Sequence, residues 1–104
     1  MDSQVKKIVN ELKAIISKKY QLKELRLFGS SARGDRTNES DIDVFVCLAK
    51  VNRKIEEDLF DMAYDLELKY GYTIDIFVFD TSIHEGVNSY LPVYRNILKE
   101  GIAI

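Results

Sequence analysis

The sequence predicts an α/β or α+β domain whose sheet is covered by helices on at least one face. Apolar residues recur at helical spacing in two segments, at about residues 5–16 and 53–70. Short apolar runs typical of strands follow each of them, at residues 25–28, 42–48 and 73–79. Helices alternating with strands in this way indicate one compact unit, and we expect residues 1–104 to form a single domain.

The expected order is helix, strand, turn, strand, helix, strand and a closing helix. The run at 25–28 ends at Gly29, residues 31–33 suit a brief helical turn, and residues 35–40 read as a polar loop. Pro92 and the apolar positions after it predict a short helix that ends before Gly101. Residues 102–104 are expected to be extended.

The bulk composition excludes several classes of protein. With 15 Lys and Arg against 17 Asp and Glu, the net charge of −2 gives no general reason to expect nucleic-acid binding. No apolar stretch approaches the roughly 20 residues needed to cross a bilayer, and no secretory signal is visible, so we expect a cytoplasmic protein. The single Cys47 lies in an apolar run and is interpreted as a small buried hydrophobe.

Three aspartates lie in or directly before the predicted strands. Asp41 and Asp43 fall two residues apart, so both point to one face of their strand, while Ile42 and the alternate apolar residues after it point to the other. Asp75 interrupts the later strand in the same manner. Clustered carboxylates repel unless a cation lies between them, and oxygen ligands favour Mg²⁺ or Mn²⁺ over zinc. Taken singly, each aspartate could equally be an exposed turn or surface residue.

A Gly-Ser pair lies directly after the first predicted strand. Gly29 lets the backbone approach a ligand closely, and Ser30 can offer a hydroxyl and an N–H group to a phosphate. Arg33 and, less closely, Arg36 could neutralise that charge, although arginines in polar loops are commonly just solvated. Alone, the pair equally fits a helix cap, with Ser30 as the N-cap residue.

Read together, Gly29-Ser30, ten intervening residues and Asp41-Ile42-Asp43 resemble the signature of the DNA polymerase beta-type nucleotidyltransferase superfamily. The wider string from Gly29 to Gly34, the length of the chain and Asp75 most resemble its minimal nucleotidyltransferase (MNT) family. This resemblance implies the polymerase beta-like fold, a small mixed sheet flanked by helices. It also implies transfer of a nucleoside monophosphate, AMP from ATP in the leading hypothesis, to a hydroxyl with release of pyrophosphate.

The resemblance also implies roles for individual residues. Asp41, Asp43 and Asp75 would be the catalytic residues and metal ligands, with Asp75 also activating the acceptor, and Mg²⁺, or alternatively Mn²⁺, would be the cofactor. Gly29, Ser30 and Arg33 would bind the nucleotide. Many members of the family act as antitoxins beside a HEPN-domain RNase toxin, and some transfer AMP to a toxin tyrosine, so we expect such a protein partner.

Two alternatives remain open for the acceptor. A small hydroxylated molecule, such as an aminoglycoside, would use the same carboxylates but would need a second domain or a homodimer to enclose it. A non-catalytic antitoxin would neutralise its toxin by contact alone. Phe45 and Phe77 continue the carboxylate face beyond the site, where we expect the C-terminal segment to pack over them as ordinary core. His84 is assigned no role.

Overall fold

The computed structural model describes residues 3–29, 42–84 and 92–104, without the side chains of some residues near the C-terminus. Its helices are α1 (Ser3–Lys19), α3 (Arg53–Tyr70), the short 3-10 helix η1 (Thr81–His84) and α4 (Pro92–Glu100). Its strands are β1 (Leu22–Phe28), β2 (Ile42–Leu48), β3 (Ile74–Asp80) and β4 (Ile102–Ala103). The order of α1, β1, β2, α3, β3 and α4 is the one that the sequence predicted, whereas η1 was not predicted. The helical turn expected at residues 31–33 lies outside the described residues.

The four strands form one mixed sheet in the order β3-β2-β1-β4. β1 is antiparallel to both β2 and β4, whereas β2 and β3 are parallel and are joined through α3. A parallel pair needs such a crossover, because its second strand must start at the same end as the first. The predicted α/β class with a small mixed sheet is therefore confirmed.

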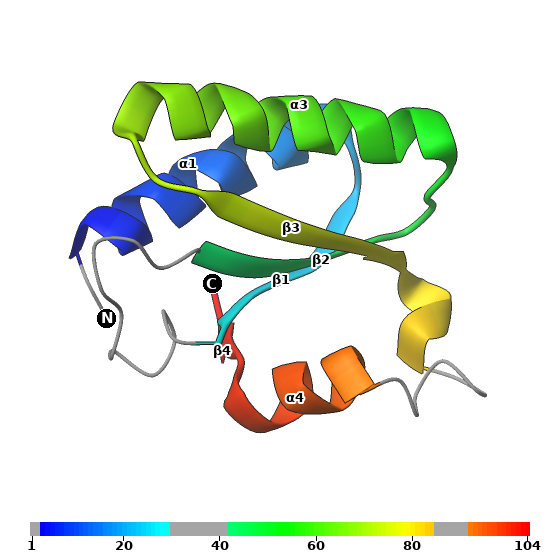
Figure 1. Ribbon diagram of the computed structural model, residues 1–104. Coiled ribbons are helices and arrows are strands. Elements are labelled where there is room, and N and C mark those ends of the chain that lie inside the picture. The colour runs from blue at the N-terminus through cyan, green and yellow to red at the C-terminus, as the bar shows by residue number, and fades with distance from the viewer. Residues whose placement is uncertain (1–2, 30–41, 85–91) are drawn as a thin grey trace.

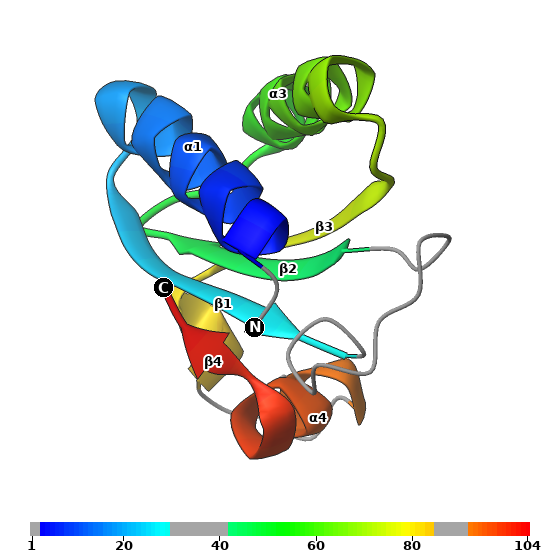
Figure 2. The same ribbon diagram turned by 90° about the vertical axis from the view of Figure 1, so that its left-hand side faces the viewer.

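Helices cover both faces of this sheet (Figures 1 and 2). α1 and α3 lie side by side on one face, and α4 lies on the other. The first face carries the larger core, built from the alternate apolar residues of β2 and the inward stripes of α1 and α3, including Val44, Leu12 and Leu59. The second face carries a smaller cluster around Phe45 and Ile97, both of which are fully buried.

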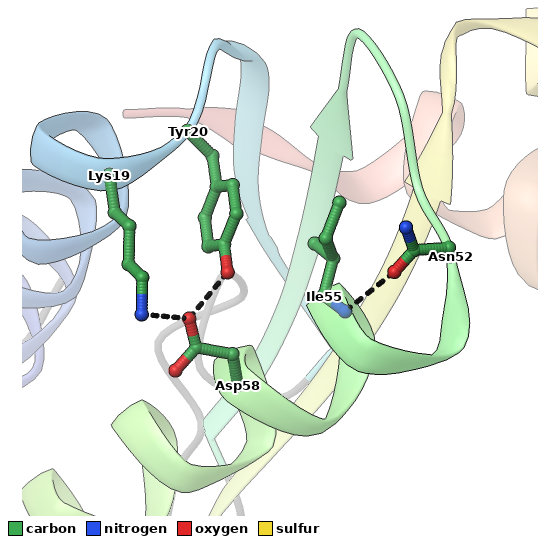
Figure 3. Close-up of polar contacts among 5 residues, drawn as sticks. All are labelled: Lys19, Tyr20, Asn52, Ile55 and Asp58. Atoms are coloured by element: carbon green, nitrogen blue, oxygen red, sulfur yellow. Dashed lines mark hydrogen bonds and ion pairs between the residues drawn. The ribbon is translucent and has the colours of Figure 1, made fainter.

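Local signals set the ends of α3. The Asn52 side chain accepts a hydrogen bond of 2.9 Å from the Ile55 N–H and so caps the first turn, as Figure 3 shows. At the other end Gly71 adopts a left-handed conformation with φ of 74°, and its N–H donates to the Glu67 carbonyl. The helix therefore covers the whole segment that the sequence pattern predicted.

Two polar clusters join α1 to α3. Lys19 Nζ lies 2.7 Å from Asp58 Oδ2, and the hydroxyl of Tyr20 donates to the same oxygen (Figure 3). Further along the pair of helices, Lys69 and Tyr70 both donate to the carboxylate of Glu11. These contacts hold the two helices together outside their shared apolar core.

The first strand is longer than expected. β1 begins at Leu22 rather than near residue 25, and its pairing with β2 shifts register between Leu22 and Glu24. A register shift of this kind breaks the two-residue alternation on which the pattern depends.

The end of the chain matches the expectation of an extended tail, since β4 pairs with β1 and the Ile104 N–H donates to the Leu25 carbonyl. In the described parts of the chain, no helix is long and apolar enough to span a membrane.

Candidate active site

Two of the predicted aspartates lie side by side in the sheet. Asp43 of β2 and Asp75 of β3 are direct partners in the parallel pairing, so their side chains leave the same face of adjacent strands. Both residues are half-buried. The strands that carry Asp43 and Asp75 are therefore neighbours, as a shared role for the two carboxylates requires.

Gly29 follows the end of β1 and lies against Asp43. Its φ of 71° is in the left-handed region, which glycine adopts without the steric cost that other residues meet. A Cβ atom at this position would overlap the Oδ2 atom of Asp43 and would lie 3.3 Å from its Cγ atom. The absence of a side chain at Gly29 thus leaves room for the carboxylate itself, a role that the sequence pattern did not predict.

The other predicted site residues lie outside the described residues. These are Ser30, Arg33 and Asp41, together with the expected turn and loop at 31–40. Within the described ranges, no group of three or more His, Cys, Asp or Glu side chains could hold a metal ion. Gly29, Asp43 and Asp75 are the predicted site residues that the structure brings together.

A cluster of aromatic side chains lies beside the two carboxylates, on the same face of the sheet. The rings of Phe28 and Phe77 lie 5.4 Å apart, and those of Phe45 and Phe79 lie 5.6 Å apart. Tyr94 of α4 packs against the cluster from outside the sheet, with its ring centroid 6.4 Å from that of Phe45. The expectation that the C-terminal segment covers this face is therefore confirmed.

Cys47 belongs to the same cluster and is fully buried. Burial away from water, reinforced by the negative charges of Glu24 and Asp80, raises the pKa of its thiol to about 11. A thiol with this pKa is almost entirely protonated at neutral pH and is a poor nucleophile. Its interpretation as a small buried hydrophobe agrees with the structure.

Asp80, at the end of β3, is also acidic but is held differently. Both the N–H and the hydroxyl of Ser82 donate to its Oδ1 atom, and these hydrogen bonds lower the pKa of its carboxyl. Side chains alternate along a strand, so Asp80 leaves β3 on the face opposite to Asp75. A variant of Asp80 therefore removes a carboxyl group from β3 without changing the face that carries Asp75.

A groove reaches Asp75 from the outer side of β3. It has a volume of about 510 Å³ and runs between α3 and β3, with Phe60, Tyr64 and Phe77 among its lining residues. The sequence pattern did not predict it. The sequence did contain a signal for this groove: Phe60, Tyr64 and Leu68 follow one another at helical spacing and extend the apolar stripe of α3 beyond its buried face. All three side chains are exposed.

Chemically, these residues can bind a hard cation and an anion next to each other. Asp43 and Asp75 supply adjacent carboxylate oxygens, which are the ligands that Mg²⁺ and Mn²⁺ prefer. Gly29 adds a position where the backbone can closely approach a phosphate.

Comparisons with known proteins agree with this chemistry. The model of the family described as "Nucleotidyltransferase domain" matches residues 9–104. A relative from Methanocaldococcus jannaschii, named as a candidate protein adenylyltransferase, is 37% identical over 82 residues. That match covers 79% of this chain and 81% of the relative.

Solved structures share the fold at lower sequence identity. One described as a candidate minimal nucleotidyltransferase has a TM-score of 0.69 at 20% identity, with 100% of this chain and 97% of that chain covered. A chain in the complex of tri-AMPylated Shewanella oneidensis HEPN toxin with MNT antitoxin has a TM-score of 0.57 at 19% identity, with coverages of 95% and 70%. The match over residues 9–104 and the relative that is 37% identical show that this chain belongs to the nucleotidyltransferase domain family.

Proposed function

We propose that this enzyme is a metal-dependent adenylyltransferase that moves AMP from ATP to a hydroxyl group of a HEPN-type toxin and acts as its antitoxin. The observation that carries the proposal is the placement of Asp43 and Asp75 at partner positions on adjacent strands, with Gly29 against Asp43. This arrangement suits a polyanionic substrate that is bound together with a divalent cation.

Each proposed site residue has a distinct task. Asp41 and Asp43 would hold the metal, with Asp75 as a further ligand, and their carboxylate oxygens fit Mg²⁺ or Mn²⁺. Gly29, Ser30 and Arg33 would bind the triphosphate. When bound, the metal would neutralise phosphate charge and stabilise the leaving pyrophosphate.

The transfer itself is a single displacement at phosphorus. The acceptor oxygen forms a bond to the α-phosphorus of ATP, while the bond from that phosphorus to the bridging oxygen breaks and its electron pair leaves with pyrophosphate. The acceptor hydroxyl must lose its proton in the same step. Asp75 is the proposed acceptor of this proton, because it lies next to Asp43 and also lines the groove that opens outward.

The assignment of the partner rests on relatives. A named relative is a candidate protein adenylyltransferase, and a structural neighbour is an MNT antitoxin in complex with an AMPylated HEPN toxin. These support a protein hydroxyl as the acceptor. The proposed site of the reaction is the cytoplasm, because the reaction consumes ATP.

The reaction class can be tested with ATP labelled at different phosphates. Purified protein, Mg²⁺ and a co-expressed HEPN-domain partner would be incubated with ATP carrying ³²P at the α or the γ position. We expect label on the partner from α-labelled ATP alone. Label from γ-labelled ATP would show phosphoryl transfer instead, and label on an aminoglycoside but not on the partner would favour the small-molecule acceptor.

A second experiment tests whether neutralisation of the toxin needs catalysis. Asp43→Asn should abolish transfer, whereas Asp80→Asn, which changes a carboxyl on the other face of β3, should retain it. If Asp43→Asn still binds and neutralises the toxin in cells, the protein acts by contact alone. Loss of neutralisation with binding retained supports the enzymatic antitoxin.

A further inference from the structure

β3 lies at one end of the sheet, so one of its edges has no neighbouring strand among the described residues (Figure 1). The Thr73 carbonyl accepts from the Ile42 N–H and therefore faces β2, while the Ile74 N–H faces the other way and donates to Glu67. Because backbone groups alternate in direction along a strand, those of Ile76 and Val78 face the open edge. This edge can accept an added strand.

The groove between α3 and β3 runs along this same edge. Aromatic side chains of α3 form its wall, with Phe60 45% exposed and Tyr64 58% exposed, and Phe77 contributes from β3. Asp75 also lines it. A chain lying in the groove would thus contact the strand edge, the aromatic wall and the proposed catalytic carboxylate at once.

The charges in the groove favour one kind of occupant. Its lining includes the carboxyl groups of Asp61, Glu67 and Asp75, and no lysine or arginine is among its described lining residues. A basic segment would be attracted to this lining, whereas a second copy of the chain, paired through the same edge, would bring the same carboxyl groups together. Apolar residues between the basic ones would pack against Phe60 and Tyr64.

We propose that this groove is the acceptor site, and that it binds an extended, basic and apolar segment of the acceptor protein as an added strand beside β3. The segment would present its hydroxyl to Asp75, where the displacement described above occurs. The inference rests on the proposed transfer activity for this last step, but binding of the segment is independent of nucleotide.

Peptide binding measured without ATP separates the two proposals. The probe is a fluorescein-labelled octapeptide that alternates valine with lysine and carries a central tyrosine, with a second peptide in which glutamate replaces lysine. By fluorescence anisotropy the lysine peptide should bind at least tenfold more tightly. Equal binding of the two peptides, or binding of neither at millimolar concentration, would overturn the proposal.

Matched variants on α3 locate the bound peptide. Asp61→Lys and Tyr64→Ala should each weaken binding of the lysine peptide at least fivefold, whereas Asp65→Lys and Leu68→Ala, which change exposed residues of the same helix outside the groove lining, should not. Circular dichroism would confirm that each variant is folded. Equal effects of Asp61→Lys and Asp65→Lys would show that peptide binding depends on the net charge of the protein and not on the groove, and would overturn the proposal.

Backbone hydrogen exchange gives a second readout. The amides of Ile76 and Val78 should become protected when the lysine peptide binds, and an N-methylated version of the peptide should lose this effect. A dimer in sedimentation that dissociates on Tyr64→Ala would assign the groove to a second copy and contradict the proposal. Peptide binding without any label transfer from ATP would support the proposed binding groove and count against the proposed function.

Discussion

The α-carbon of Gly29 lies against the carboxylate of Asp43, at the point where β1 ends beside its neighbouring strand β2. This contact joins the two parts of the predicted signature, the turn after the first strand and the aspartate of the second. Any side chain at Gly29 would occupy the space that the carboxylate now fills. The glycine therefore serves the acidic residue as well as the approach of a phosphate.

Replacing Gly29 with alanine should lower the free energy of unfolding by more than the left-handed backbone conformation alone explains. Gly71 is the control, because its φ of 74° is similar to the 71° of Gly29 but nothing lies within 4 Å of the position that a Cβ atom would take there. Gly71→Ala should destabilise the protein by the left-handed penalty of ~1–2 kcal/mol. Gly29→Ala should add the cost of displacing Asp43, about 1–3 kcal/mol, and should reduce label transfer at least tenfold.

A double-mutant cycle isolates this contact. In an Asp43→Ala background the overlap is absent, so Gly29→Ala should then destabilise the protein only as much as Gly71→Ala does. Urea unfolding of the four proteins of the cycle and of Gly71→Ala measures the difference. Additive effects of Gly29→Ala and Asp43→Ala would show that the contact has no energetic consequence.

Asp58 should make the stability of the protein depend on acid pH. The hydrogen bond from Lys19, and then that from Tyr20, hold the pKa of the Asp58 carboxyl below its ordinary value of 3.8. The stabilisation is therefore complete above that ordinary value, and it is lost as the pH falls through the lower pKa of the folded protein.

The measurement is the Tm of wild type and of Asp58→Asn across pH 2–7, a range spanning both sides of the ordinary carboxyl pKa of about 4. Wild type should melt at higher temperature at neutral pH, and the gap should close toward the acid end. A gap of constant size would show that the ion pair with Lys19 does not stabilise the fold.

Cys47 should resist alkylation in the folded protein. A pKa of about 11 in place of the ordinary 9.0 leaves ~0.1% thiolate at pH 8 rather than ~10%, so reaction with iodoacetamide should be about 100-fold slower, even before the surrounding side chains block the reagent. Mass spectrometry after timed labelling checks this, with urea-unfolded protein as the control. Fast labelling of the folded protein would contradict the packing of Cys47 under α4.

Ile97 should be the residue that fixes α4 over the sheet. It is fully buried in the cluster with Phe45 and Tyr94, and truncation of such a side chain costs about 2–5 kcal/mol. Ile97→Ala should therefore lower the free energy of unfolding by that amount, whereas Leu98→Ala, which truncates a side chain that is 51% exposed, should have little effect. Chemical denaturation measures both, and equal effects would mean that α4 does not pack as described.

Much of the fold follows from local patterns in the sequence. Side-chain alternation in 42–48 and 73–79 was sufficient to predict that Asp43 and Asp75 each oppose an apolar row, and the structure confirms both strands. The boundaries of α3 were also predictable, because Asn52 and Gly71 are strong local end signals.

Other features depend on how the elements meet. The register that makes Asp43 and Asp75 direct partners depends on how α3, which connects their strands, packs on the sheet, and no local pattern specifies this. The contact of Gly29 with Asp43 and the groove beside Tyr64 likewise join segments that are distant in sequence. Composition could predict that aromatic residues line a core or its rim, but not which of them remain exposed.

The most direct test of the central claim is nucleotide-dependent binding of Mn²⁺, because it needs no acceptor. Electron paramagnetic resonance would measure free Mn²⁺ in the presence of a non-hydrolysable ATP analogue for wild type, Asp43→Asn, Asp75→Asn and the control Asp80→Asn. Wild type and Asp80→Asn should bind Mn²⁺ together with the nucleotide, and the variants of the two partner aspartates should bind it at least tenfold more weakly. Undiminished binding by Asp43→Asn and Asp75→Asn would contradict the assignment of these two residues to the catalytic metal site.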